Sequence, residues 1–356
     1  MKYMKKKDYL KYIIPLFLTV FICWYLFSQP KICADGVKNG IAMCAEIVVP
    51  SLFPFMVVSS FIIKSGMGEA LGKLLNRPTN LVFKLPGICS SVIIMSQIGG
   101  FPIGAKMTSE LLKTNAISKN QAQRMNLFCI NAGPAFIIGT VGSMMLGSTK
   151  AGVIIYVSTI FASIITGILS VAMNDKKAQL KPEKAIIKLH DPINSFVDST
   201  ASSAKAMLMI CAWVVVFRTV CDIAASLNIS PGFKLFLNCL LEVTNGCKSA
   251  SNILPIPAIA AIISFGGLSV HCQNSSFIRD SGLEMRYFYT ARLICASISA
   301  IICMELLKVF PCEIQTLVTN PNITATAYSV SVPACAALLI MSALLIFEVD
   351  TNKKVC

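Results

Sequence analysis

Residues 151–174 read AGVIIYVSTIFASIITGILSVAMN and carry no formal charge. A helix needs about 20 consecutive apolar residues to cross the hydrocarbon core of a bilayer. Two other uncharged runs, residues 12–27 and 125–149, approach or exceed that length. The chain is therefore predicted to be an all-α polytopic membrane protein, with the lipid bilayer as its first partner.

The composition supports this class and excludes others. Of 356 residues, 55% are hydrophobic and only 13% are charged, whereas a soluble domain usually carries about 25% charged residues. The net charge of +14 is spread over short segments between apolar runs, which suits anionic lipid headgroups better than nucleic acid. The 15 cysteines form no C-x-x-C pair, and most lie in apolar runs, where a thiol acts as a small hydrophobe. No nucleic-acid partner, disulfide framework or zinc site is predicted.

The apolar segments are of two kinds. Most are continuous spans, including the one near the N-terminus, where Trp24, Tyr25 and the lack of an A-x-A site argue against a cleaved signal peptide. Two others, residues 85–105 and 234–250, contain Gly, Asn or Ser clusters at mid-segment and predict re-entrant helical hairpins. About eight transmembrane helices are predicted, at residues 12–28, 41–63, 125–147, 151–173, 206–227, 255–272, 291–310 and 327–347.

The basic residues predict an orientation. Of the 31 Lys and Arg residues, the predicted outer loops hold only Lys31, Lys38, Lys150 and Lys234, and nearly all others fall in inner segments. Cytoplasmic segments of membrane proteins carry such an excess of positive charge. Both termini are therefore predicted to be cytoplasmic, so that the first hairpin enters from the inside and the second from the outside.

The two hairpins match in a way that predicts an inverted repeat. Residues 98–106, IGGFPIGAK, can be aligned with residues 240–248, LLEVTNGCK, and both end in Gly, a small residue and Lys. A span precedes each hairpin, and a span broken by small polar residues follows it, at 128–134 and 263–269. Close packing of glycine-containing helices would also explain a single such motif. Four breaks in corresponding places favour a transporter, in which interrupted helices meet at a substrate site.

The same segments resemble the YlbJ (SpoVV) family of sporulation integral membrane proteins. The resemblance rests on residues 48–55 (VVPSLFPF), 100–106 (GFPIGAK), 131–142 (NAGPAFIIGTVG), 241–246 (LEVTNG) and 264–267 (SFGG). It implies a nucleoside-recognition Gate domain and a place in the outer forespore membrane, facing the mother cell. It further implies passage of dipicolinic acid towards the forespore, with other sporulation membrane proteins as possible partners. Phe101 departs from the family pattern, in which tyrosine is common at this position.

With this resemblance the chain divides into five expected parts. They are an N-terminal transmembrane helix with an outer loop (1–40), a first Gate-type repeat (41–173), a basic cytoplasmic loop (174–205), a second, inverted Gate-type repeat (206–311), and a C-terminal transmembrane helix with a tail (312–356).

Two lysines are the first candidates for substrate binding. Lys106 and Lys248 follow Gly104 and Gly246 at equivalent positions beside the predicted breaks. A buried ammonium is costly unless it is partnered, and free N–H groups at broken helix ends attract carboxylates. Two such lysines facing each other would form a cationic pocket for a small anionic solute such as dipicolinate. Alternatively, each lysine reaches a headgroup or pairs with a carboxylate.

Neutral polar residues at the breaks are further candidates. Asn131, Asn245, Ser96 and Gln97 could bind the solute or cap the broken helix ends. Glu242 could couple transport to protons, but neutralisation of Lys248 is favoured.

Other charged residues in the spans have structural explanations. Arg218 with Asp222 and Glu305 with Lys308 are spaced to pair along a helix. His271 is expected to cap or pack rather than to bind metal.

Catalysis has little support in the sequence. There is no H-E-x-x-H motif, P-loop or G-x-S-x-G motif, and there are two histidines in all. No enzyme activity, cofactor or metal is predicted. A carrier for a small anionic solute is the favoured function, and the alternatives are a nucleoside-like or other metabolite permease and a non-transporting membrane scaffold.

Overall fold

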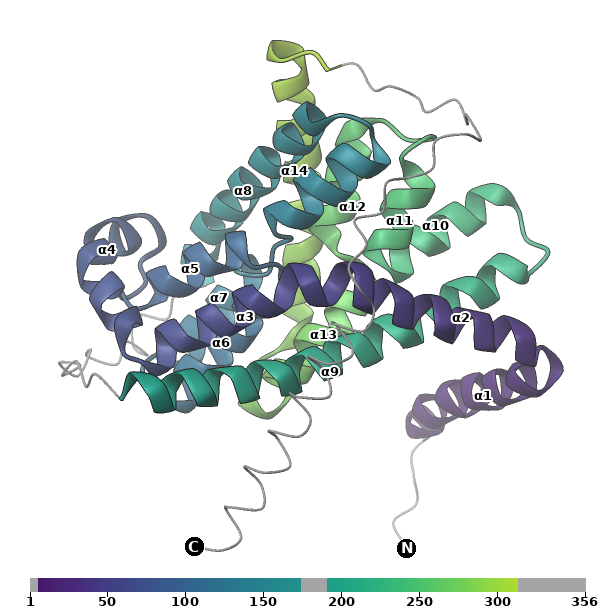
Figure 1. Cartoon of the computed structure of the whole chain (residues 1–356), viewed down its shortest axis with the longest axis horizontal. Helices are drawn as coiled ribbons and strands as arrows, with labels where there is room; N and C mark the ends of the chain where they lie inside the picture. The colour runs from purple at the N-terminus through teal and green to yellow at the C-terminus, as the bar shows by residue number, and fades with distance from the viewer. Residues whose placement is uncertain (1–5, 174–190, 313–356) are drawn as a thin grey trace, which may run out of the picture.

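The computed structural model describes residues 6–173 and 191–312, and every regular element in these ranges is a helix (Figure 1). Within the described residues, five helices are long and apolar enough to cross a membrane: Pro30–Lys64, Thr149–Ala172, Pro192–Ser226, Ile256–Ile278 and Met285–Val309. Three shorter apolar helices accompany them, at Cys89–Ile98, Ala135–Met145 and Pro231–Leu241. The chain is therefore an all-α polytopic membrane protein, as predicted.

The N-terminal part is more helical than predicted. After α1 (Lys6–Ser28), the chain forms α2 (Pro30–Met43), the π-helical turn η1 (Cys44–Val48) and α3 (Val49–Lys64). Figure 1 shows α2 and α3 as one long rod beside α9 (Pro192–Ser226). The predicted outer loop up to residue 40 is therefore wrong. Glycines make this helix pairing possible, because a Cβ on Gly40 would lie 2.8 Å from the Cα of Val215.

Helix α9 also corrects the predicted cytoplasmic loop. Its first turn is capped by the Asp191 carboxylate, which accepts hydrogen bonds from the backbone N–H groups of Ile193 and Asn194. The helix thus begins well before residue 206. Residues 174–190 and the predicted span 327–347 lie outside the described residues.

Helix α4 (Met67–Phe83) is an element that the uncharged runs do not predict. It carries Lys73 and Arg77 and is interrupted neither by its Pro78 nor by its polar residues. Arg124 joins it to the rest of the molecule, because this buried guanidinium donates to the carbonyl oxygens of Phe83 and Lys84 and to Ser170 O at 3.1 Å. The carbonyls of Phe83 and Lys84 lie at the C-terminal end of α4, where helix carbonyls have no partner within the helix.

All four predicted interruptions are present. In the first half, Gly99 and Gly100 separate α5 (Cys89–Ile98) from α6 (Phe101–Lys113), and non-helical residues 129–133 separate α7 (Lys119–Phe128) from the π-helical η2 (Ala135–Met145). The second half repeats the pattern. Glu242 separates α10 (Pro231–Leu241) from α11 (Val243–Ala250), and Gly266, with φ +86°, separates α12 (Ile256–Phe265) from α13 (Gly267–Ile278).

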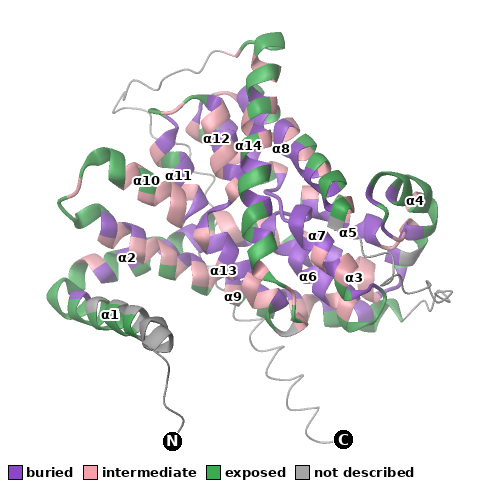
Figure 2. Cartoon of the chain, turned by 180° about the vertical axis from the view of Figure 1, so that it is seen from behind, coloured by how far each residue is buried: buried purple, intermediate pink, exposed green. Residues whose placement is uncertain are grey.

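Each half ends in a helix that packs against its broken span. In the first half, α8 (Thr149–Leu169) packs against η2 and continues into the short η3 (Ser170–Met173). In the second half, α13 leads through η5 (Arg279–Ser281) to α14 (Met285–Val309), which packs against α12 and α8. Figure 2 shows buried residues concentrated around α5 to α7 and the breaks, while α1 is largely exposed. The opposite membrane orientation of the two halves stays a prediction.

Candidate functional site

The first-half site is a hydrogen-bond cluster around Ser163 of α8. The Gln97 side-chain amide donates to Ser163 Oγ at 3.0 Å, and the Asn131 amide donates to the same atom at 3.1 Å. Ser163 Oγ in turn donates to the carbonyl oxygen of Phe128 at 2.8 Å. Gln97 immediately precedes the hairpin break, and Asn131 lies in the span break. Two predicted site residues are thus brought together by a serine that sequence reasoning missed.

Backbone contacts hold these two breaks together. A Cβ on Gly104 would overlap the carbonyl oxygen of Cys129, so α6 packs directly on the break of the neighbouring span. A Cβ on Gly133 would lie 2.6 Å from the carbonyl oxygen of Ile98. Ser96, also predicted as a site residue, is fully buried and donates to the carbonyl oxygen of Ile93 at 2.8 Å within its own helix.

The second-half site is built around Glu242. Its carboxylate is 3% exposed and accepts hydrogen bonds from the backbone N–H groups of Thr244 at 3.1 Å and Asn245 at 2.8 Å. Glu242 therefore caps the N-terminus of α11, where a carboxylate also meets the positive end of the helix dipole. The favoured interpretation of Glu242 as the counter-ion of Lys248 is wrong, because both carboxylate oxygens are directed at this helix end.

Asn245 links the second hairpin to α9. Its side-chain oxygen accepts a hydrogen bond from Arg218 Nη1 at 2.5 Å, and the Arg218 guanidinium pairs with the Asp222 carboxylate at 3.1 Å. The predicted pairing of Arg218 with Asp222 along the helix is confirmed, and its contact with the hairpin is an addition. Gly246 packs against α10, since a Cβ there would lie 2.8 Å from the Cα of Cys239.

The two halves meet at Arg292, which sequence reasoning missed. This side chain of α14 is 1% exposed. It donates to the carbonyl oxygens of Ile130 and of Leu127, the latter at 2.7 Å, and reaches Ser264 O at 3.4 Å. One guanidinium therefore satisfies carbonyls at the breaks of both broken spans. The signal in the sequence is a single arginine at the start of the predicted span 291–310.

The two candidate lysines lie in different surroundings. Lys106 is 5% exposed, and its ammonium donates to Ser203 Oγ at 2.9 Å and Ser202 Oγ at 3.4 Å on α9. Glu110 Oε1 lies 4.0 Å away. Lys248 is exposed on α11 and shares none of these contacts. The two lysines therefore do not form the expected cationic pocket. They occupy equivalent positions in the two hairpins, but their side chains have different neighbours.

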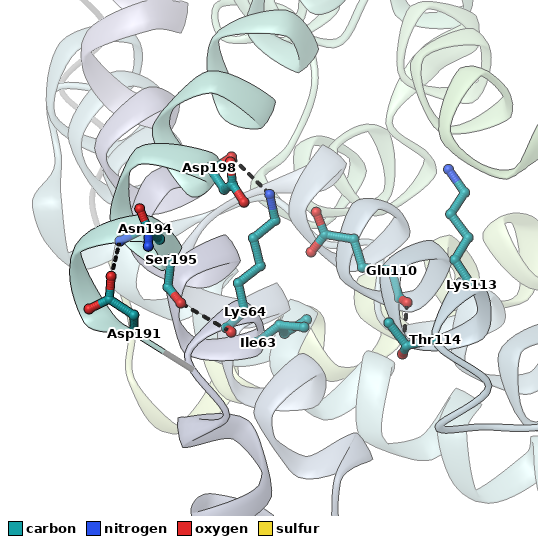
Figure 3. Close-up of a pocket in the computed structure, with 9 residues that line it drawn as sticks. All are labelled: Ile63, Lys64, Glu110, Lys113, Thr114, Asp191, Asn194, Ser195 and Asp198. Atoms are coloured by element: carbon teal, nitrogen blue, oxygen red, sulfur yellow. Dashed lines mark hydrogen bonds between the residues drawn. The ribbon is translucent and has the colours of Figure 1, made fainter. Parts of the chain in front are cut away.

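A pocket of about 620 Å³ lies between α3, α6 and the start of α9, and Glu110, which approaches Lys106, is one of its lining residues (Figure 3). Lys64 lines it and donates to the carbonyl oxygen of Asp198 at 2.8 Å and to Ser202 Oγ at 3.3 Å. Figure 3 shows the Glu110 carboxylate directed towards the Lys64 side chain. Lys64 and Lys106 donate to the same Ser202 hydroxyl, so this hydroxyl links the pocket to the polar groups around Lys106.

Two other polar groups considered in the sequence analysis, His271 and the pair Glu305 and Lys308, have structural partners. His271 lies 3.0 Å from the carbonyl oxygen of Phe265 and packs against the rings of Phe265, Phe288 and Tyr289, in accord with the expected packing role. The ammonium of Lys308 pairs with Glu305 at 2.7 Å, as predicted. Among residues 6–173 and 191–312, no group of three metal-ligating side chains is present.

Comparison with known proteins identifies a relative. The chain is 25% identical over 334 residues to the sporulation integral membrane protein YlbJ of Bacillus subtilis (strain 168), and the match covers 82% of this chain and 81% of that protein. The chain is a homologue of YlbJ. No family model matches the sequence, and no solved structure matches it.

The similarity to YlbJ confirms the resemblance that the sequence motifs indicated. The match covers most of both chains, so it extends well beyond a single shared motif. The name of YlbJ places that protein in a membrane and in sporulation, and it names neither a solute nor a partner. The Gate domain stays an expectation.

Proposed function

We propose that this protein is a sporulation membrane transporter that carries a small anionic solute, with dipicolinate as the expected substrate, across the outer forespore membrane. The observation that carries the proposal is the meeting of interrupted helices from both halves around buried polar groups. The similarity to YlbJ supports the sporulation setting.

The physical argument concerns backbone groups at membrane depth. Unpaired N–H and C=O groups are tolerated in a bilayer only where protein or a water-filled cavity satisfies them. Here Arg292 donates to carbonyls at the two span breaks, and Ser163 joins the amides of Gln97 and Asn131. A protein that only filled the membrane would have no need of such interruptions. Paired interruptions of this kind are typical of secondary transporters.

A second contact supports alternating access between the halves. The ring of Phe101, at the start of α6, lies against Gly266, where a Cβ would come within 3.3 Å of it. The break of the first hairpin thus touches the break of the second broken span. Movement of one half relative to the other would change this contact, so both breaks take part in one conformational equilibrium.

The proposed cycle contains no chemical conversion of the solute. We infer that the solute enters and leaves unchanged, and that gradients of solute or ions supply the energy. The charge bias of the sequence would place both termini in the cytoplasm of the mother cell.

The direct test is flux through the purified full chain in proteoliposomes loaded with Tb³⁺, whose luminescence reports dipicolinate that has entered. Entry above the rate of protein-free liposomes, with no entry of the neutral pyridine-2,6-dicarboxamide (followed by chromatography), is expected. A matched pair of variants serves as control: Gly104→Leu should abolish flux because it separates α6 from Cys129, whereas Gly139→Ala, which has open space around it, should preserve it.

Two outcomes would contradict the proposal. Uptake of radiolabelled uridine with no dipicolinate flux would favour the nucleoside-like permease. Absence of any specific flux in correctly inserted protein would favour a membrane scaffold.

A further inference from the structure

Two ammonium groups and one carboxylate form a cluster at the pocket in Figure 3. Lys64 of α3 and Lys106 of α6 both donate to the hydroxyl of Ser202 on α9, at 3.3 and 3.4 Å. The Glu110 carboxylate lies 4.0 Å from the buried ammonium of Lys106 and lines the pocket together with Lys64. The cluster therefore keeps a surplus of positive charge next to open space.

Glu110 is held loosely in this cluster. Its Oε1 atom lies 4.0 Å from the Lys106 ammonium and accepts a hydrogen bond from Ser60 at 3.4 Å. Its Oε2 atom is buried and has no hydrogen-bond partner. A buried carboxylate oxygen without a partner is unfavourable, so replacing it by a better placed anion would relieve this cost.

We propose that the pocket is an entry site for a small dicarboxylate, in which one solute carboxylate takes the place of Glu110 beside Lys106 and the other binds Lys64. The inference rests on the proposed transport function and names the residues that first receive the solute. In the absence of solute, the Glu110 carboxylate occupies this position and competes with other anions for the two ammonium groups.

The other charged groups around the pocket do not compete for this role. Asp191 is engaged in capping α9, and the side chains of Asp198 and Lys113 are exposed. Exposed charges are screened by water and salt, whereas Lys106 and Glu110 are shielded. The volume of about 620 Å³ lies within the range of small-molecule sites, and it exceeds what a single aromatic dicarboxylate requires.

The test is equilibrium binding of dipicolinate to the purified full chain, measured by calorimetry. Glu110→Gln should tighten binding about tenfold, because it removes the competing charge. Lys106→Gln and Lys64→Gln should each weaken binding about tenfold or more. The matched control is Lys205→Gln. Lys205 is an exposed lysine on α9, about one turn after Ser202, and its substitution should leave the Kd unchanged.

The monocarboxylate picolinate assigns the two ends of the ligand. Its binding should fall with Lys106→Gln and be unchanged by Lys64→Gln, since it has no second carboxylate. The gain of affinity in Glu110→Gln is the decisive measurement, because misfolding cannot produce it.

Failure of this inference is distinct from failure of the transport proposal. Dipicolinate flux by the native chain, together with an unchanged Kd in the Lys64, Lys106 and Glu110 variants, would overturn the entry site and leave transport intact. Weakening by Lys248→Gln but not by Lys64→Gln would also overturn it in favour of the lysine pair predicted from the sequence. Binding that follows the expected pattern without any flux would support the site and overturn transport.

Discussion

The two hairpins share a backbone plan but differ in their chemistry. Gly100 and Glu242 occupy the same position, immediately before α6 and α11. The carboxylate of Glu242 caps its own helix, whereas Gly100 has no side chain to cap α6. Lys106 is buried against α9, while its counterpart Lys248 is exposed. The second hairpin therefore supplies its own capping carboxylate, whereas the first keeps a buried cation 4.0 Å from Glu110, a carboxylate that lines the pocket.

The difference indicates that the two copies of a repeated unit can have different roles, one in stability and one in solute binding. In the second half, Glu242, Asn245, Arg218 and Asp222 compensate one another and stabilise the break. In the first half, neutral amides join the break to α8, and the charged groups lie on the other side of α6. We expect substitutions in the second half to affect stability first, and substitutions in the first half to affect solute binding as well.

The largest effect should come from filling the glycine contacts of the two hairpins. Gly104→Ala places a methyl group on the carbonyl of Cys129, and Gly246→Ala places one 2.8 Å from the Cα of Cys239. Gly104→Ala should reduce stability by more than about 3 kcal/mol and Gly246→Ala by less. Thermal unfolding in detergent measures both, with Gly139→Ala as control. Equal losses would show that the hairpins are packed alike.

Removing the shared guanidinium should have the next largest effect. Arg292→Met leaves carbonyls of both broken spans unpaired, so a loss of about 3 kcal/mol is expected. Arg292→Lys should restore little of it, because one ammonium cannot reproduce the planar guanidinium geometry. The exposed Arg286 on the same helix supplies the control, Arg286→Met. An unchanged melting temperature in Arg292→Met would show that the breaks are held by other contacts.

Removal of the Glu242 cap should reduce stability less than the preceding substitutions, and the effect should be confined to the second half. Glu242→Ala should lower stability by about 1–2 kcal/mol, because two N–H groups of α11 lose their acceptor. Glu242→Gln keeps an acceptor oxygen and should lose less. Hydrogen exchange of α11, compared with α6, locates the effect, and Glu305→Ala on the exposed face of α14 is the control. Faster exchange in both hairpins alike would argue against a local cap.

The smallest effect should come from Lys248. Lys248→Gln is expected to change dipicolinate flux less than about twofold, because this side chain is exposed, whereas Lys106→Gln should reduce flux about tenfold. Initial rates in proteoliposomes measure the difference. Similar losses of flux in both variants would indicate that the two lysines have equivalent roles.

The interruptions were predictable, and their partners were not. Gly100 and Gly266 indicate where a helix stops, because both adopt positive φ, which glycine tolerates without strain. Ser163 and Arg292 gave no comparable signal, since each lies in a helix remote in sequence from the breaks that it contacts. Lys106 and Lys248 follow the same local pattern, yet α9 covers one of them and leaves the other exposed.

The amino-acid sequence by itself determined the membrane class, several of the long apolar helices and the four breaks, because apolar length and glycine placement act locally. The pairing of Lys106 with Ser203 and Glu110, the capping role of Glu242 and the bridge made by Arg292 were decided by the tertiary structure. Which helix covers a given residue depends on packing across the whole chain, and a local pattern carries no record of that.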